Sequence, residues 1–265
     1  SSAASDVYKR QEKKRMKYFR MTLQYSNKYI WYLLLLAVCP SVLTAFVFSP
    51  YGTIDYFCNF RSFYGSDFRT IYLVASGINP KLYYLGIVGL VVIPVCFSIL
   101  FGAVERHMRV GEFNLGFDRI LTRLNFNFLT ALKFSMTLFA VYEIFKFLQV
   151  VMFYLLTHSL QIEWAFALSL IWYVALYAAE LFLLAATILW VPTMLQTGLS
   201  STKALGLAIR QGAKQIFPTM VSLMIPTLPM LILMVVNSVL NLKLDIVLDA
   251  ILLTISIVFY VIYMY

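Results

Sequence analysis

The chain has 265 residues, of which 62% are hydrophobic and only 12% are charged, and its mean hydropathy is +0.82. Soluble domains carry about a quarter charged residues, so this composition excludes a soluble globular domain and predicts an integral membrane protein. The long apolar runs do not alternate with polar residues as the strands of a membrane barrel do. The predicted fold class is therefore an all-α, polytopic bundle of membrane helices.

The first eleven residues, SSAASDVYKRQ, are small, polar and unlike the sequence that follows. Codons for this peptide can spell a transposon-based sequencing adapter, so residues 1–11 are predicted to be a translated adapter rather than native sequence. On that interpretation the native sequence starts at Glu12 and the chain is a fragment. Residues 12–28 are predicted to be a basic cytoplasmic segment, and residues 29–265 to be the transmembrane domain.

Six apolar runs in the chain are long enough to cross the hydrocarbon core, which is about 30 Å thick and takes about 20 helical residues. Consecutive runs are predicted to pair as three antiparallel hairpins. The six predicted spans are residues 29–48, 82–104, 130–156, 162–193, 217–239 and 246–265.

Basic residues are distributed unequally between the two sets of connections. Four lie in the connections after the first, third and fifth spans, whereas thirteen lie on the other side. The positive-inside rule places the thirteen, and hence both ends of the chain, in the cytoplasm. Because every cluster is next to a span, topology and anionic lipid explain the charge better than nucleic acid does. The thirteen are Lys13, Lys14, Arg15, Lys17, Arg20, Lys28, Arg106, Arg109, Arg119, Arg123, Lys203, Arg210 and Lys214.

Two of these basic segments have the periodicity of amphipathic helices that lie at the membrane surface. The first, FDRILTRLNFNF, carries Arg119 and Arg123, and the second, STKALGLAIRQGAK, carries Lys203, Arg210 and Lys214. Both are predicted to be cytoplasmic elbow helices. They either anchor the bundle in the headgroup layer or dock a cytoplasmic or membrane protein partner.

The connection over residues 49–81 is long and rich in tyrosine and phenylalanine. Aromatic side chains at this density favour apolar contacts, so the segment is predicted to fold back onto the mouth of the bundle or the headgroup layer. A ligand lid is the functional alternative. Of the three cysteines only Cys58 lies in this connection, which predicts no external disulfide and buried structural roles for Cys39 and Cys96.

Charged residues inside predicted spans are costly and normally face protein or water. The third span carries Glu143, Lys146 and Gln149 at intervals of one helical turn, and the fourth carries Glu180. Together these residues form a candidate intramembrane polar site. They serve either as a buried structural pair or as a proton or ion relay, and Lys146 has two possible partners, Glu143 and Glu180.

Pro226 and Pro229 lie inside the fifth apolar run, where each removes a backbone hydrogen bond. A kinked or broken helix is therefore predicted, and interrupted helices are one pointer to transporter binding sites.

Sequence motifs of catalytic, metal or cofactor sites are absent from the chain. Capping and interface solvation explain Asp245 and Asp249, at the start of the sixth run, at least as well as catalysis does. No catalytic residue, metal or cofactor is predicted.

Three segments resemble the YesL-type group of small bacterial membrane proteins. They are CPSVLTA, FDRILTRLNFNFLTALKF and WVPTMLQTGLSSTKALGLAIRQGAKQIFPTMVSLMIP, and the likeness covers mainly residues 102–235. It implies a bacterial plasma-membrane accessory protein and supplies no catalytic residues. The long connection over 49–81 departs from the group. GAKQIFPTMVSLMIP also resembles the coupling loop of ABC permeases, although the acidic residue and the Asp-Gly of that loop are missing.

The function expected from the sequence is that of a non-enzymatic accessory, regulatory or scaffolding membrane protein. The alternative is a transporter or permease subunit that uses Glu143, Lys146, Glu180 and the proline-broken fifth span. A membrane enzyme is a third class, which the missing motifs disfavour.

Overall fold

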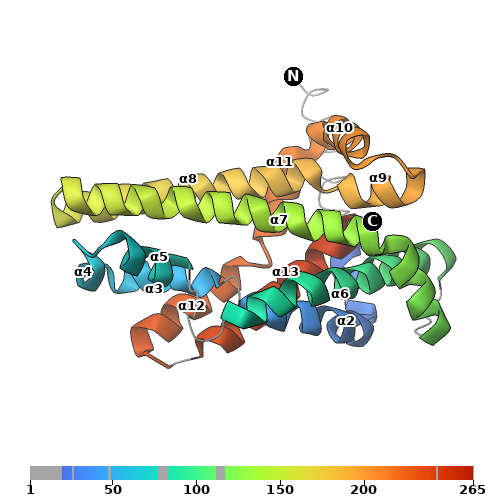
Figure 1. Ribbon diagram of the computed structural model, residues 1–265, viewed down its shortest axis with the longest axis horizontal. Coiled ribbons are helices and arrows are strands. Elements are labelled where there is room, and N and C mark those ends of the chain that lie inside the picture. The colour runs from blue at the N-terminus through green and yellow to red at the C-terminus, as the bar shows by residue number, and fades with distance from the viewer. Residues whose placement is uncertain are drawn as a thin grey trace, which may run out of the picture.

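The structure, a computed structural model, describes residues 20–25, 27–46, 49–76, 83–111, 117–242 and 244–264. Within these ranges the regular secondary structure is entirely helical (Figure 1). The predicted adapter and most of the basic segment before the first span lie outside them. The elements are α2 (Ile30–Ala45), α3 (Pro50–Cys58), α4 (Phe60–Phe63), α5 (Phe68–Ser76), α6 (Tyr83–Val110), α7 (Phe117–Ser159), α8 (Ile162–Thr187), α9 (Trp190–Thr197), α10 (Ser201–Gly212), η1 (Ala213–Gln215), α11 (Ile216–Met224), α12 (Leu228–Leu240) and α13 (Asp245–Met264).

Four stretches of these helices are long and apolar enough to cross a membrane, and the bent pair α11 and α12 makes five if it counts as one span. The chain is thus a membrane-embedded helical protein. The first predicted span corresponds to α2, whose 16 residues fall short of the roughly 20 that a crossing takes. The four stretches are Val88–Val110, Asn127–Ser159, Ile162–Thr197 and Asp245–Met264.

Helices α7 and α8 form an antiparallel hairpin that runs the length of the molecule, and α6, α2 and α13 pack beneath one half of it (Figure 1). Within α7, which has 43 residues, the stretch Asn127–Ser159 has 33 residues and is about 50 Å long, more than the thickness of the hydrocarbon core. The elbow helix predicted over FDRILTRLNFNF is continuous with α7 and not a separate helix, although this first part is turned away from the long run of α7 in Figure 1. The physical reason is that residues 117–159 contain neither glycine nor proline to interrupt a helix.

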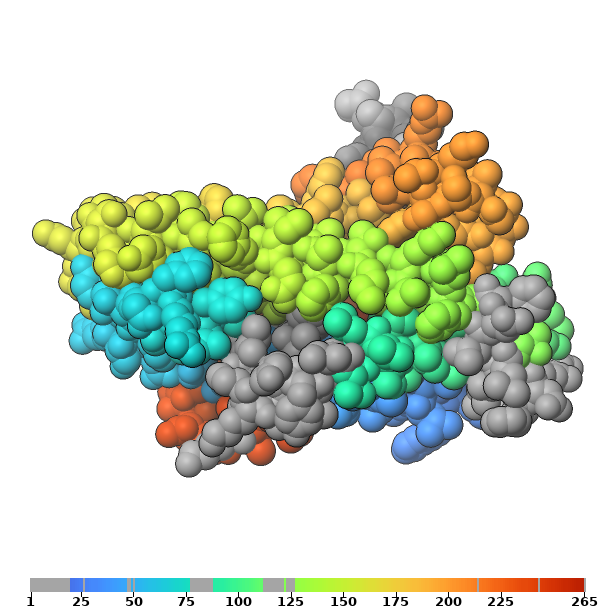
Figure 2. All heavy atoms as spheres, in the orientation of Figure 1, coloured from blue at the N-terminus to red at the C-terminus, as the bar shows by residue number. Residues whose placement is uncertain are grey.

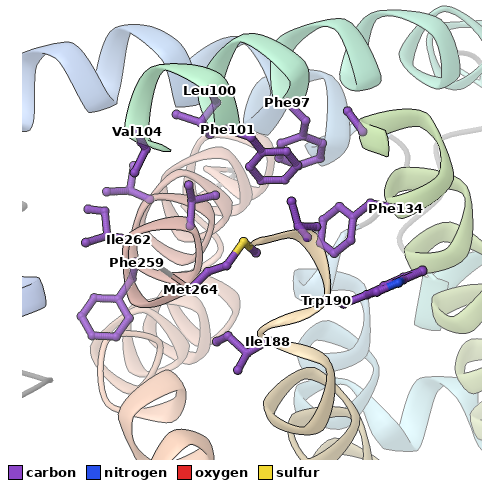
Figure 3. Close-up of a cluster of buried hydrophobic side chains, with 14 of the residues drawn as sticks. Phe97, Leu100, Phe101, Val104, Phe134, Ile188, Trp190, Phe259, Ile262 and Met264 are labelled. Atoms are coloured by element: carbon purple, nitrogen blue, oxygen red, sulfur yellow. The ribbon is translucent and has the colours of Figure 1, made fainter. Parts of the chain in front are cut away.

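The main apolar core lies where α6, α7, α9 and α13 meet (Figure 3). Phe134 of α7 contributes to this core, with its ring centroid 5.6 Å from that of Phe101 and 6.2 Å from that of Trp190. The indole N–H of Trp190 donates to the carbonyl of Ser201 at 3.0 Å. This bond fixes the start of α10 to the core.

The aromatic connection after α2 folds into the three short helices α3, α4 and α5. They pack on the half of the α7–α8 hairpin that is nearer its tip (Figure 2). The Tyr56 ring stacks on Phe153 with a centroid distance of 4.6 Å. The Tyr64 hydroxyl donates to the carbonyl of Leu160, at the hairpin tip, at 2.6 Å. The predicted folding back of this segment is therefore confirmed for residues 49–76.

Cys39 of α2 and Cys96 of α6 have their sulfur atoms 3.7 Å apart. Cys39 is exposed on the protein surface, so the prediction of a buried structural role is wrong for this residue. Its neighbours along α2 are apolar, and we assign that surface to lipid contact.

This proximity predicts that a membrane-permeant oxidant such as copper phenanthroline joins the two thiols, which together give up two electrons and two protons to the oxidant. Maleimide labelling of the unfolded chain is expected to find one free thiol after oxidation and three before it. A Cys58→Ser variant should cross-link normally, whereas Cys39→Ser should not. Failure of the Cys58→Ser variant to cross-link would contradict the packing of α2 on α6.

Candidate functional site

Two helix ends meet beside the part of α7 that carries Glu143, Lys146 and Gln149. Helix α3 starts at Pro50, α5 ends at Ser76, and the two helices pack together. The first N–H groups and the last carbonyl groups of a helix have no partner within the helix. Buried helix ends therefore need polar side chains from elsewhere in the fold, and α7 and α13 supply them.

Lys146 closes the end of α5. Its ammonium group donates to the carbonyl of Ala75, in the last turn of α5, at 3.1 Å and to the Thr53 hydroxyl at 2.7 Å. The Thr53 hydroxyl accepts a further bond from the Gln149 amide at 3.1 Å and donates to the same Ala75 carbonyl at 2.9 Å. A positive charge at the carbonyl end of a helix also complements the helix dipole.

This network is sealed inside the protein. Lys146 is 6% exposed and Gln149 is 4% exposed. Both of the lone pairs of the Thr53 oxygen and its hydrogen are engaged. Lys146 thus hydrogen-bonds to a helix end, and neither of the two carboxylates considered from the sequence is its hydrogen-bond partner.

Asp249 closes the start of α3. One of its carboxylate oxygens accepts the backbone N–H of Tyr51 at 3.1 Å, and the other accepts the hydroxyl of Ser49, the residue that caps α3. Asp249 is only 1% exposed. A negative charge at the N–H end of a helix is the electrostatic counterpart of Lys146 at the end of α5.

The carboxylates of Glu180, Asp249 and Glu143 act electrostatically on the Lys146 ammonium group. The Tyr142 ring lies 5.5 Å from the same nitrogen. Glu143 itself accepts a long hydrogen bond of 3.4 Å from the Tyr72 hydroxyl of α5. Burial raises the pKa of Tyr72, and the Glu143 charge raises it further, so this hydroxyl keeps its proton and remains a donor.

The fifth predicted span is broken between α11 and α12, which are bent by 40° relative to each other. Pro226 lies in the break, and Pro229 is in the first turn of α12, where a missing N–H costs nothing. The Thr227 hydroxyl donates to the carbonyl of Met224 at 2.8 Å and lies 3.2 Å from the Tyr177 hydroxyl of α8. Glu180 follows Tyr177 by one turn, so it lies on the same side of α8.

The basic candidates are separated from this cluster. Arg119 and Arg123 belong to the first part of α7, and Lys214 belongs to η1, but their side chains lie outside the described part of the chain. Lys203 and Arg210 are exposed on α10. In Figure 1, α10 lies toward the end of the molecule opposite the tip of the α7–α8 hairpin.

Sequence reasoning missed Ser49 and Thr53, and it assigned Asp249 to capping at the start of its own helix, whereas Asp249 caps α3. The Ser49-Pro50 dipeptide is a helix-start signal and could have located α3. Its carboxylate partner lies 200 residues away in the chain, and no local pattern identifies a contact at that separation.

The arrangement is a set of paired charges and helix ends, and no group of three or more metal-ligating side chains gathers among the described residues. No family model matches the chain, and neither a curated protein nor a solved structure does so. The resemblance to the YesL-type group therefore rests on the quoted segments alone.

Proposed function

We propose that the protein is a non-enzymatic accessory or scaffolding protein of the membrane. The observation that carries this proposal is that the buried charges of Lys146 and Asp249 stabilise helix ends. Lys146 and Asp249 hydrogen-bond to the ends of α5 and α3 and are sealed from solvent. A solute pathway needs charged groups that water or substrate can reach, whereas these two hold short helices in place.

The proposed topology has six crossings with both ends in the cytoplasm, in the plasma membrane of a bacterium. The distribution of basic residues supports it. The arrangement in Figure 1 also agrees with it, because the end of α6, the start of α7 and α9 lie at one end of the molecule. The resemblance over residues 102–235 to the YesL-type group agrees with an accessory role.

Reconstitution into liposomes tests this proposal. We expect proteoliposomes to dissipate an imposed H⁺ or Na⁺ gradient no faster than protein-free liposomes. Cross-linking in native membranes is expected to join the basic cytoplasmic segments to another protein. Protein-dependent ion flux would overturn the proposal.

A transporter subunit is the second candidate, and the surroundings of Glu180 favour it. This side chain is only partly buried, is beside the break between α11 and α12, and acts electrostatically on both Lys146 and Tyr177. Helix breaks near buried charges are a feature of transporter binding sites.

For this candidate, Glu180→Gln is expected to abolish protein-dependent H⁺ flux while the yield and melting temperature stay within about 2 °C of the wild type. The exposed Glu163→Gln, near the hairpin tip of α8, is the matched control and should transport normally. Equal flux from the Glu180→Gln variant and the wild type would remove Glu180 from any pathway.

A further inference from the structure

Helix α10 is docked firmly against the membrane-spanning helices. Its buried side is a stripe of small residues, Ala204, Ala208 and Gly212. A Cβ atom at Gly212 would lie 3.5 Å from the carbonyl oxygen of Ala186 in α8, which shows how closely the two backbones approach. With the Trp190 bond to Ser201 at its other end, the helix is held along its length.

The side of α10 opposite that stripe carries Lys203 and Arg210. At 100° per residue these two positions lie within about 20° of each other and about 140–160° from Ala208, the centre of the buried stripe. Both side chains are exposed. Gly206 lies between them, with open space around the position of a side chain. Two cations therefore point outward along one line on a rigid helix.

Nothing in the surrounding sequence neutralises this charge. Residues 181–244 contain four basic residues and no acidic residue. Exposed apolar side chains occur in the same region of the chain: Ile209, next to Arg210 on α10, is 42% exposed, and Phe217, at the start of α11, is 78% exposed. Cations next to exposed apolar side chains, at the point where membrane helices begin, match the boundary between lipid headgroups and hydrocarbon.

From these observations we propose that the outer face of α10, formed by Lys203 and Arg210, binds the phosphate groups of anionic phospholipids. The proposal does not depend on the accessory role of the protein. A lipid fits better than an acidic protein segment, because the exposed side chains of Ile209, next to Arg210, and of Phe217, at the start of α11, need an apolar environment. A bilayer supplies phosphate and hydrocarbon at adjacent depths.

The test is thermal unfolding of the full chain in neutral detergent micelles, with phosphatidylglycerol or phosphatidylcholine titrated in. Phosphatidylglycerol is expected to raise the melting temperature of the wild type in a saturable way, and phosphatidylcholine is not. A basic residue near an anionic surface is worth about a fivefold change in binding. The double variant Lys203→Gln/Arg210→Gln should therefore need roughly 30-fold more phosphatidylglycerol for half of the stabilisation.

The matched control removes two exposed arginines at the other end of the molecule, Arg61 and Arg69. Arg61→Gln/Arg69→Gln should respond to phosphatidylglycerol as the wild type does. Equal responses from the two double variants would overturn the proposal. So would full stabilisation of the wild type by inorganic phosphate alone, because the site would then bind a free anion. Loss of a cross-linked acidic protein from the Lys203→Gln/Arg210→Gln variant, with an unchanged lipid response, would assign the face to a protein partner instead.

Discussion

The Lys146→Met variant is expected to lose about 3 kcal/mol of unfolding free energy, the usual cost of removing one partner from a buried charged network. For a chain of this size that loss lowers the melting temperature by about 6–12 °C. Methionine fills most of the space of the lysine side chain but donates no hydrogen bond. The Ala75 carbonyl keeps only its bond from Thr53, and three carboxylates lose the cation that acts on them.

Thermal unfolding in detergent measures this loss, and hydrogen exchange locates it. We expect amide exchange to rise most in α5, whose end Lys146 closes. Lys133→Met is the matched control, because Lys133 lies on the same helix but is exposed. The control should melt within about 2 °C of the wild type. Equal melting temperatures for the two variants would contradict the role of Lys146 in stabilising the end of α5.

A double variant separates the two contributions to the stability loss of Lys146→Met, which are the lost hydrogen bonds to α5 and the carboxylates left without a cation. If uncompensated carboxylates contribute, adding Glu180→Gln to Lys146→Met should recover about 1 kcal/mol, which is a typical coupling energy for residues in one charged network. Strict additivity of the two single changes would mean that the lost hydrogen bonds to α5 account for the whole effect.

The helical class and most helix positions were predictable from local patterns. Long apolar runs located α6, α7, α8 and α13, and Pro226 and Pro229 located the bend between α11 and α12. The chemistry is local in these cases, because hydrocarbon forces the backbone into helices and proline removes an N–H wherever it occurs.

The partners of the buried charges were not predictable. The sequence offers Glu143, one turn away, and Glu180 of the next span as partners of Lys146, yet the lysine donates its hydrogen bond to Thr53, 93 residues away. A sequence pattern cannot identify a helix-end carbonyl as a partner, because every residue has a backbone carbonyl. The sequence could show that Lys146 needed a partner, but only the packing of α3 and α5 on α7 shows that the partner is a helix end.

Asp249→Ala is the second large effect that we expect, with a loss of about 3 kcal/mol. The substitution leaves the Tyr51 N–H and the Ser49 hydroxyl buried without an acceptor, and an unsatisfied buried donor costs about 1–3 kcal/mol. Asp249→Asn keeps one acceptor oxygen for Tyr51 and should lose only about 1 kcal/mol, a value at the low end for a helix cap.

Two measurements show whether Asp249 acts as the cap of α3 or whether α13 only requires a negative charge near its start. Asp245→Asn changes a partly exposed carboxylate one turn earlier in α13 and should cost less than about 1 kcal/mol. In Asp249→Ala, amide exchange should rise first in α3, because that helix loses the acceptor at its start, while α13 stays protected. Exchange that rises in α13 and leaves α3 unchanged would mean that Asp249 stabilises its own helix. In that case α3 would be held by the apolar contact between Tyr56, in its last turn, and Phe153.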